Sequence, residues 1–296
     1  MKANPAPRWE TGQGPVSLGE PLFLGILNIT PDSMSDGGRF LDPAAALAQA
    51  RRLAERGARM LDLGAESTRP GAAAVPPAEE WSRLEPVIRL LRGELPGLPL
   101  SVDTRNAGVA ALCLAAGVAA LNDVAGFRDP AMRALARSSG CGLIAMRSRM
   151  QGRDFVMPPY GEPGPPAEAA EAIAELVQVR DRLLAEGIAP ERILLDPGFG
   201  FGFPFSGDSA LWRALPELPA ALDWPVQRFC LGISRKRFLA YRAGTPALPP
   251  GDRDALTAEA HREAHGLGYR VFRTHAALLP RAGGARDGSA LEPVEG

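Results

Sequence analysis

From Leu22 onward, the chain alternates between short apolar runs and longer segments whose apolar residues recur at helical spacing. Each apolar run ends in polar residues. Eight such runs occur, at residues 22–30, 60–67, 98–104, 119–124, 142–147, 193–198, 228–234 and 269–275. Strands that alternate with helices pair in parallel through right-handed crossovers, so the pattern predicts eight strand–helix units.

Seven of the helices are clear from the pattern, at residues 43–55, 77–91, 106–116, 130–138, 166–185, 208–218 and 253–267. The first has Asp42 as an N-cap and Pro43 at its first position, and Gly57 lies just beyond its end. After the eighth run, Pro280 and the glycines at 283–284 leave room for little more than one turn. We therefore expect either a truncated eighth helix or a disordered C-terminal segment.

Eight strand–helix units in one domain predict an α/β fold of the (β/α)₈ TIM-barrel type. A doubly wound open sheet is the alternative, but no glycine-rich dinucleotide fingerprint follows the first strand. The barrel is expected to span residues 21–280. Residues 1–20 are rich in Pro and Gly and have no hydrophobic period, so they are expected to form a flexible tail, as are residues 281–296.

Composition narrows the functional classes. The 296 residues suit a single barrel, and a net charge of −1 gives no indication of a nucleic-acid-binding surface or a polybasic membrane anchor. The sequence contains no apolar run of about 18 residues, as a membrane helix requires, and no signal peptide. Three scattered cysteines do not suit a disulfide framework, so a cytoplasmic location is expected. The only lysines among the 33 basic residues are Lys2 and Lys236.

The candidate functional groups lie at the C-terminal ends of the apolar runs, which in a TIM barrel form the face that carries the active site. Any one of them has an alternative role as a cap of the next helix. Their convergence on one rim favours a binding site instead. The residues at this rim are Asn28, Glu66, Asp103, Asn122, Asp123, Asp196, Ser234, Arg235, Lys236, Arg273 and His275.

The chemistry of this rim divides into two parts. The acceptors of Asp103, Asn122 and Asp196 suit a flat heterocycle with several N–H donors, such as an aminopyrimidinone, on which Phe199 or Phe201 could stack. The basic residues after the seventh and eighth strands occupy the place where barrels often bind phosphate, and Asn28 is adjacent once the barrel closes. His261 and His265 have the spacing of a metal pair, but they lie a whole helix away from the rim without an obvious third ligand.

Several motifs resemble the signatures of dihydropteroate synthases, in order and in spacing. The opening signature is LGILNITPDSMSDGGRF (24–40), and the second is LDLGAESTRPGA (61–72). The remaining matches are SVDTRNAGVA, LNDVAG, LLDPGFGFG, GISRKRF and the Arg-x-His at 273–275. The resemblance covers about residues 22–276 and implies a TIM barrel that is usually a homodimer, is characteristically inhibited by sulfonamides, and joins p-aminobenzoate to 7,8-dihydropterin-6-ylmethyl diphosphate with Mg²⁺.

The resemblance also implies roles for individual residues. The pterin would be held by Asp103, Asn122, Asp196 and Lys236, with Met146 and Phe201 lining its pocket. Diphosphate would be bound by Asn28, Arg273 and His275, and Asn28 would reach the Mg²⁺. The p-aminobenzoate site would be bordered by Thr68, Arg69, Pro70 and Ser234.

The chain departs from the family pattern at five positions. These are Met34 for an aromatic residue, Ala65 for Gly, Arg147 for His, Phe203 for Lys and Ala276 for Asp. Two alternatives are open. The departures and the short C-terminal segment favour a degenerate homologue that binds pterin without turnover. A pterin-dependent methyltransferase would share the Asp/Asn pterin pocket but would not need the first two signatures.

Overall fold

Eight parallel strands form the centre of the molecule in the computed structural model, which describes residues 7–30, 42–66, 75–152, 154–156, 158, 160 and 169–276. The strands are β3 (Leu22–Asn28), β4 (Ala58–Gly64), β5 (Leu100–Asp103), β6 (Ala120–Asp123), β7 (Gly142–Met146), β10 (Ile193–Asp196), β11 (Cys230–Leu231) and β12 (Val271–Thr274). Their order in the sheet is β10-β7-β6-β5-β4-β3-β12-β11. An isolated parallel bridge between Leu195 and Phe229 brings the two edges together, so the sheet closes into a barrel.

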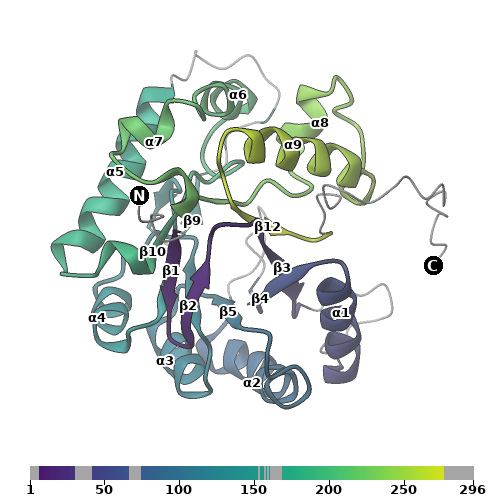
Figure 1. The fold of residues 1–296 in the computed structure, drawn as a ribbon, viewed down its shortest axis with the longest axis vertical. Helices are drawn as coiled ribbons and strands as arrows, with labels where there is room; N and C mark the ends of the chain where they lie inside the picture. The colour runs from purple at the N-terminus through teal and green to yellow at the C-terminus, as the bar shows by residue number, and fades with distance from the viewer. Residues whose placement is uncertain are drawn as a thin grey trace, which may run out of the picture.

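The helices surround this barrel, as Figure 1 shows. Those assigned in the described residues are α1 (Pro43–Glu55), α2 (Pro77–Glu94), α3 (Ala107–Ala115), α4 (Pro130–Ser139), α5 (Ala169–Ala185), α6 (Phe205–Arg213), α7 (Leu218–Ala221), α8 (Arg237–Arg242) and α9 (Asp254–Gly266). The start of α1 has the predicted cap, because the Asp42 carboxylate accepts a hydrogen bond from the Ala44 N–H at 3.1 Å.

The TIM-barrel prediction is confirmed, and each of the eight apolar runs overlaps one barrel strand. The single helix expected at 208–218 is wrong: α6 ends at Arg213, and Pro216 separates it from the short helix α7. The pattern also missed α8 and a small hairpin, β8 (Met150–Gln151) with β9 (Asp154–Phe155). The expected truncated eighth helix falls outside the described residues.

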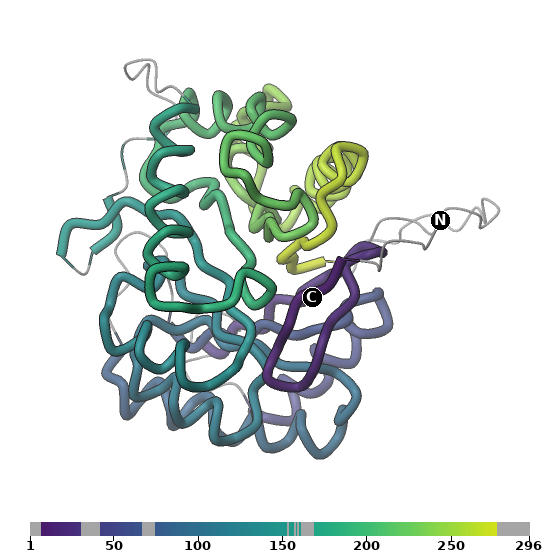
Figure 2. The backbone as a smooth tube through the Cα atoms, turned by 60° about the vertical axis from the view of Figure 1, so that its left-hand side comes forward, coloured from purple at the N-terminus to yellow at the C-terminus, as the bar shows by residue number. Residues whose placement is uncertain are grey.

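An N-terminal hairpin packs against the barrel where a flexible tail was expected. Strands β1 (Arg8–Thr11) and β2 (Gly14–Ser17) pair antiparallel, and Figure 2 shows them in purple. Trp9 is fully buried and donates its indole N–H to the Arg192 carbonyl at 2.9 Å. Gly142 admits the indole, since a Cβ there would lie 2.8 Å from the Trp9 ring. The prediction was wrong for residues 8–18, because Trp9 and Leu18, both fully buried, anchor them without a hydrophobic period.

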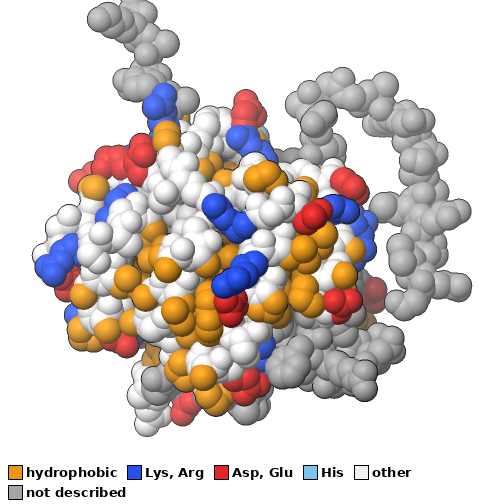
Figure 3. All heavy atoms as spheres, turned by 90° about the horizontal axis from the view of Figure 1, so that it is seen from below, with side chains coloured by type: hydrophobic (Ala, Val, Ile, Leu, Met, Phe, Trp, Pro, Cys, Tyr) orange, Lys and Arg blue, Asp and Glu red, His pale blue; other side chains and the backbone are white. Residues whose placement is uncertain are grey.

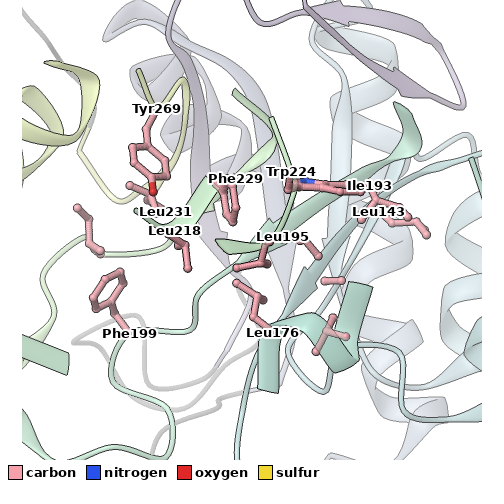
Figure 4. Close-up of a cluster of buried hydrophobic side chains, with 14 of the residues drawn as sticks. Leu143, Leu176, Ile193, Leu195, Phe199, Leu218, Trp224, Phe229, Leu231 and Tyr269 are labelled. Atoms are coloured by element: carbon pink, nitrogen blue, oxygen red, sulfur yellow. The ribbon is translucent and has the colours of Figure 1, made fainter. Parts of the chain in front are cut away.

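Apolar side chains fill both the barrel and the layer between the barrel and the helices. Inside the lower barrel, Trp9 packs in one cluster with Leu24, Met60, Ile144 and Leu194. The largest cluster joins the strands to the helices, and Figure 4 shows part of it. Its labelled members are Leu143, Leu176, Ile193, Leu195, Phe199, Leu218, Trp224, Phe229, Leu231 and Tyr269. Apolar side chains thus fill the N-terminal end of the barrel, and the C-terminal ends of the strands carry the polar groups.

The described surface carries both signs of charge. In Figure 3, basic, acidic and apolar side chains lie interspersed over the described part of the face. Among the described residues, helices of 18 residues or more all fall short of the apolarity needed to cross a bilayer.

His261 on α9 is a buried polar group in the apolar layer. Its ring lies 4.7 Å from the Phe272 ring and 5.8 Å from the Phe23 ring, measured between centroids. Neither ring nitrogen has a hydrogen-bond partner within the described ranges. Burial lowers the pKa of His261 to about 4, so the folded protein holds this side chain neutral.

Replacing His261 should therefore stabilise the fold. His261→Leu is expected to raise the free energy of unfolding by about 1–3 kcal/mol at pH 7, because a buried unpaired polar group is removed. The gain should grow as the pH falls from about 6.5 towards 4, since the unfolded chain takes up a proton there and the folded chain does not. Urea unfolding at several pH values measures it, with the half-buried His265→Gln as control. A stability difference between His261→Leu and the unaltered protein that does not change with pH would contradict the neutral, unpaired state of His261.

Candidate active site

Polar residues from adjacent strands lie in one row at the C-terminal end of the barrel. In the strand register Asn28 is opposite Gly64, Gly64 is opposite Asp103, and Asp103 is opposite Asn122. Residues in register on parallel strands project to the same side of the sheet, so these side chains share a face. Asp62 precedes Gly64 by one strand period and therefore lies on that face, one layer lower.

Asp62 is the buried acceptor at the centre of this site. Its side chain is 0% exposed. One carboxylate oxygen accepts from the Ser101 hydroxyl, and the other accepts from the Asn122 amide at 3.0 Å and from Nε of Arg273. Three donors from three other strands thus converge on one carboxylate, which offsets the cost of burying its charge.

Arg273 joins the two layers of carboxylates. Its Nε donates to Asp62, and its Nη2 donates to Oδ2 of Asp103 at 2.8 Å. Burial acts to lower the pKa of Arg273, but the two carboxylates outweigh it and hold the pKa above its ordinary value. Burial also raises the pKa of Asp103, and Arg273 opposes that shift. The guanidinium therefore remains charged at the centre of the rim.

Asp196 and Lys236 form the opposite side of the site. Asp196 is 4% exposed and accepts a hydrogen bond from the Gly198 N–H at 2.8 Å. Burial raises the pKa of Asp196, whereas Gly198 and Lys236 act to lower it. Burial lowers the pKa of Lys236 to about 8, and the Asp196 charge limits this shift. Lys236 is thus within reach of losing its charge at moderately alkaline pH.

An apolar surface lies next to these charges. Met146, Val124 and Phe201 form one buried cluster, against which Phe155 of the β8–β9 hairpin packs. The Lys236 ammonium nitrogen lies 4.1 Å from the centroid of the Phe201 ring. A cation over an aromatic face beside buried acceptors suits a planar, polar heterocycle.

Ser234 and His275 lie side by side at the end of the barrel. The Ser234 hydroxyl accepts from the His275 backbone N–H at 3.1 Å and lies 3.2 Å from Nδ1 of its ring. Burial, followed by the charges of Arg273, Arg235 and Lys236, lowers the pKa of His275 to about 3. His275 is therefore a neutral hydrogen-bonding group, and a bound anion would favour its charged form.

Two charged rim residues turn away from the site. Arg235 adopts a left-handed backbone conformation with φ of 57° and pairs with Asp254 at 2.6 Å. Asp123 accepts from the backbone N–H groups of Ala125 and Phe127 at 2.7 and 2.8 Å, so it holds a turn. The helix-capping alternative is wrong for Asp123, because Asp129 is the N-cap of α4. The sequence suggested a phosphate-site role for Arg235 that its pairing with Asp254 does not favour.

The structure leaves three predicted p-aminobenzoate residues undescribed. Thr68, Arg69 and Pro70 lie outside the described residues, as does Met34. The resemblance also implies that the loops at 30–40 and 66–72 close over this site, and these loops are described only at Thr30 and Glu66. The described members of the predicted site are Asn28, Asp103, Asn122, Met146, Asp196, Phe201, Ser234, Lys236, Arg273 and His275, and all ten lie at the C-terminal ends of the strands or just beyond them.

The donor set fits a magnesium ion only if a ligand completes it. No group of three or more His, Cys, Asp or Glu residues suited to a metal ion occurs in the described ranges. Asn28 offers one amide oxygen, near the backbone of Gly64. Mg²⁺ often keeps waters and takes most of its other ligands from substrate phosphates, so one protein oxygen is compatible with it.

The main residue that the motifs did not assign is Asp62. It stands inside an apolar run, where a carboxylate is rare unless it is paired, and that position was the available signal. Its partner Arg273 is 211 residues further along the chain. The closed barrel, which makes β3 the neighbour of both β4 and β12, brings the two together.

Comparison with known proteins identifies relatives along almost the whole barrel. The family described as "Pterin binding enzyme" matches residues 24–275. The dihydropteroate synthase of Neisseria meningitidis serogroup B is 41% identical over 245 residues, covering 80% of this chain and 81% of the relative. The dihydropteroate synthase of Mycobacterium leprae is 38% identical over 270 residues, covering 89% and 92%.

Solved structures give the same result. Xanthomonas albilineans dihydropteroate synthase with 4-aminobenzoic acid superimposes with a TM-score of 0.79 at 37% identity, covering 91% of this chain and 93% of that one. Burkholderia cenocepacia dihydropteroate synthase complexed with 7,8-dihydropteroate has a TM-score of 0.75 at 33% identity, covering 91% of each chain.

The Asp62 network predicts a large effect on stability. Asp62→Leu should lower the free energy of unfolding by about 3–5 kcal/mol, because it leaves the Arg273 cation with one carboxylate in place of two and removes the acceptor of Asn122. Urea unfolding measures the loss. Ser101→Ala, which removes only one neutral donor, should cost about 1 kcal/mol. Equal losses in the two variants would show that the charge of Asp62 does not organise the rim.

Proposed function

The chain belongs to the pterin-binding enzymes, in the dihydropteroate synthase family, and from this premise we propose how its site acts. The enzyme is a transferase of folate biosynthesis that joins p-aminobenzoate to 7,8-dihydropterin-6-ylmethyl diphosphate and releases diphosphate. The observation that carries this function is a set of acceptors placed beside Lys236 at the rim of a barrel with these relatives. Asn122 and Asp196 are buried, and the Asp103 side chain is 12% exposed.

The pterin site is proposed at the acceptor side of the rim. The N–H groups of an aminopyrimidinone can donate to Asp103 and Asp196, and charge-assisted bonds of this kind are strong in a partly dry pocket. Asn122 is held by Asp62 and can present its carbonyl oxygen. Phe201 and Met146 supply an apolar wall, and Lys236 supplies a donor to a ring carbonyl or nitrogen.

The diphosphate site is proposed at Asn28, Arg273 and His275. Arg273 brings a fixed cation, and its Nη1 makes no hydrogen bond within the described ranges. A bound Mg²⁺ would neutralise negative charge on the leaving diphosphate, with Asn28 as a protein ligand. The p-aminobenzoate site is proposed next to it, bordered by Ser234 together with Thr68, Arg69 and Pro70.

The reaction requires no covalent enzyme nucleophile. The C–O bond between the pterin methylene and the diphosphate breaks, and its electron pair leaves with the diphosphate, where Arg273 and His275 stabilise the charge. The electron-rich pterin ring stabilises the resulting cation. The p-aminobenzoate nitrogen then forms the new bond to the methylene carbon and releases a proton. Positioning and charge stabilisation supply most of the rate.

The two alternatives are not favoured by the relatives. A pterin-dependent methyltransferase would not need the signatures at 24–40 and 61–72, and the similar proteins reported above are synthases. A degenerate pterin-binding homologue remains the useful contrast for experiments. We also propose a homodimer and a cytoplasmic location; the three cysteines are unpaired and buried, which suits a reducing compartment.

Diphosphate release tests the function. The purified protein, with the pterin diphosphate, p-aminobenzoate and Mg²⁺, should release diphosphate and form dihydropteroate in equal amounts, and chelation of Mg²⁺ should suppress both. Binding of a pterin without release of diphosphate would identify a degenerate homologue. Methyl transfer from methyltetrahydrofolate would identify the methyltransferase.

Lys236→Arg should lose about tenfold or more in kcat/KM, which corresponds to roughly 1.4 kcal/mol, although it conserves charge. A compact ammonium fits between Phe201 and the acceptors, whereas a guanidinium is larger and needs fork-shaped acceptors. Activity of the unaltered enzyme should fall above about pH 8 as Lys236 loses its proton, and this alkaline decline should be absent from the arginine variant. Steady-state kinetics of the unaltered enzyme and of Lys236→Arg between pH 6 and 9.5 test both expectations. Unchanged kcat/KM in the variant would show that Lys236 has no role in the reaction.

Asp196→Ala should weaken binding of a neutral pterin analogue by roughly 2–5 kcal/mol, or about 30-fold to several thousand-fold, because it removes the buried partner of the ligand donors. Isothermal titration measures the affinity. Asp181→Ala on α5, whose side chain is 55% exposed, is the matched control and should bind as the unaltered protein does. A change below about threefold in Asp196→Ala would remove this residue from the pterin site.

A further inference from the structure

The glycine-rich loop at 197–203 follows β10 and carries Phe201 into the candidate site. Three of its residues, Gly198, Gly200 and Gly202, have positive φ angles of 71°, 77° and 94°. Glycine gives such a loop many accessible conformations, so an outside constraint is needed to hold one of them. The contacts behind the loop provide that constraint.

Arg147, at the end of β7, is bonded to the loop backbone. Its side chain is 1% exposed. Nε donates to the Pro197 carbonyl at 2.7 Å, and Nη2 donates to the carbonyls of Gly198 and Phe201 at 3.0 and 3.1 Å. The remaining nitrogen, Nη1, pairs with Glu175 on α5 at 2.8 Å. The rigid fork of the guanidinium thus fixes three loop carbonyls relative to a helix.

Phe203 covers the same guanidinium. The Arg147 Cζ atom lies 4.3 Å from the centroid of the Phe203 ring, and the Arg149 Cζ atom lies 4.2 Å from it. Arg147 and Phe203 are two of the positions at which the chain departs from the family pattern, and here they form one cation–aromatic contact. A lysine at 203 would place a third cation among these two arginines.

Asp208 on α6 also holds the loop, but whereas Arg147 donates to loop carbonyls, Asp208 is an acceptor for a loop N–H group. Its side chain is fully buried, and both carboxylate oxygens accept from the Gly200 N–H, at 3.1 and 3.0 Å. It also accepts from the Tyr160 hydroxyl at 2.8 Å. Burial raises the pKa of Asp208 to about 6, so the carboxylate is largely ionised at neutral pH. Carbonyls and an amide of one loop are therefore bound by a cation and an anion.

We propose that Arg147, with Asp208, positions the glycine-rich loop so that Phe201 faces Lys236 and the pterin. Arg147 acts through the loop backbone and is a positioning residue rather than a catalytic one. The inference rests on the proposed function, since it assigns the loop to the pterin pocket. Removing the guanidinium releases three carbonyls at once, and the loss falls on the pterin rather than on p-aminobenzoate.

The test compares Arg147→Met with Arg149→Met in the full-length protein. Arg149 stacks on the same ring and pairs with the same Glu175, but it bonds none of the loop carbonyls within the described ranges. Arg147→Met should raise the KM for the pterin diphosphate about tenfold or more, with the KM for p-aminobenzoate changed less than threefold. Amide hydrogen exchange across 197–203, followed by mass spectrometry, should accelerate. Arg149→Met should leave both measurements near those of the unaltered protein.

Three outcomes would overturn the proposal: equal rises in both KM values, equal exchange in the two variants, or unaltered kinetics with a faster-exchanging loop. If Arg147→Met does not fold, Arg147→Lys, which cannot reach all three carbonyls with a single fork, is carried through the same measurements. Absence of turnover in the unaltered protein would reject the proposed function alone. Exchange and titration with a neutral pterin analogue would then still decide whether Arg147 positions the loop.

Discussion

A carboxylate buried inside a barrel must be paired, and at Asp62 this constraint organises the rim. Arg273, Asn122 and Ser101 all donate to it, so residues from β12, β6 and β5 are drawn to one point of β4. Arg273 then extends to Asp103, which links the lower layer to the row where ligands would bind. Because an unpaired charge at this depth costs several kcal/mol, the polar groups of the site and the stability of the barrel are coupled.

The site has two kinds of support. Backbone pairing of parallel strands fixes the positions of Asp103, Asn122 and Asp196 and the face to which each side chain projects. Phe201 stands on a loop without such pairing, and side chains that touch no substrate hold that loop. The strand-borne acceptors thus do not depend on the loop, which has supports of its own such as the contact between Arg147 and Phe203.

The positions of the strand-borne acceptors can be predicted from the sequence, because the ends of strands and the hydrophobic period are local properties of the chain. The eight apolar runs place Asp103, Asn122 and Asp196 at strand ends, and parallel pairing then brings them to one rim. Contacts that depend on closure do not follow from local pattern, such as the pairing of Asp62 with Arg273. The N-terminal hairpin is held mainly by Trp9 and Leu18, which are too few to leave a periodic signal. Nor does any spacing rule reveal that Arg147 packs on Phe203.

Strand pairing around the barrel is least extensive at the junction between β10 and β11. In the described structure the one β-bridge across it joins Leu195 to Phe229, and β11 itself has two residues. Asp196 stands on one side of this seam, and Lys236 follows the strand on the other. A ligand bound to both Asp196 and Lys236 would connect the two sides of this junction. Ligand binding would then oppose local opening of the barrel between β10 and β11, so that binding of substrate stabilises the closed barrel.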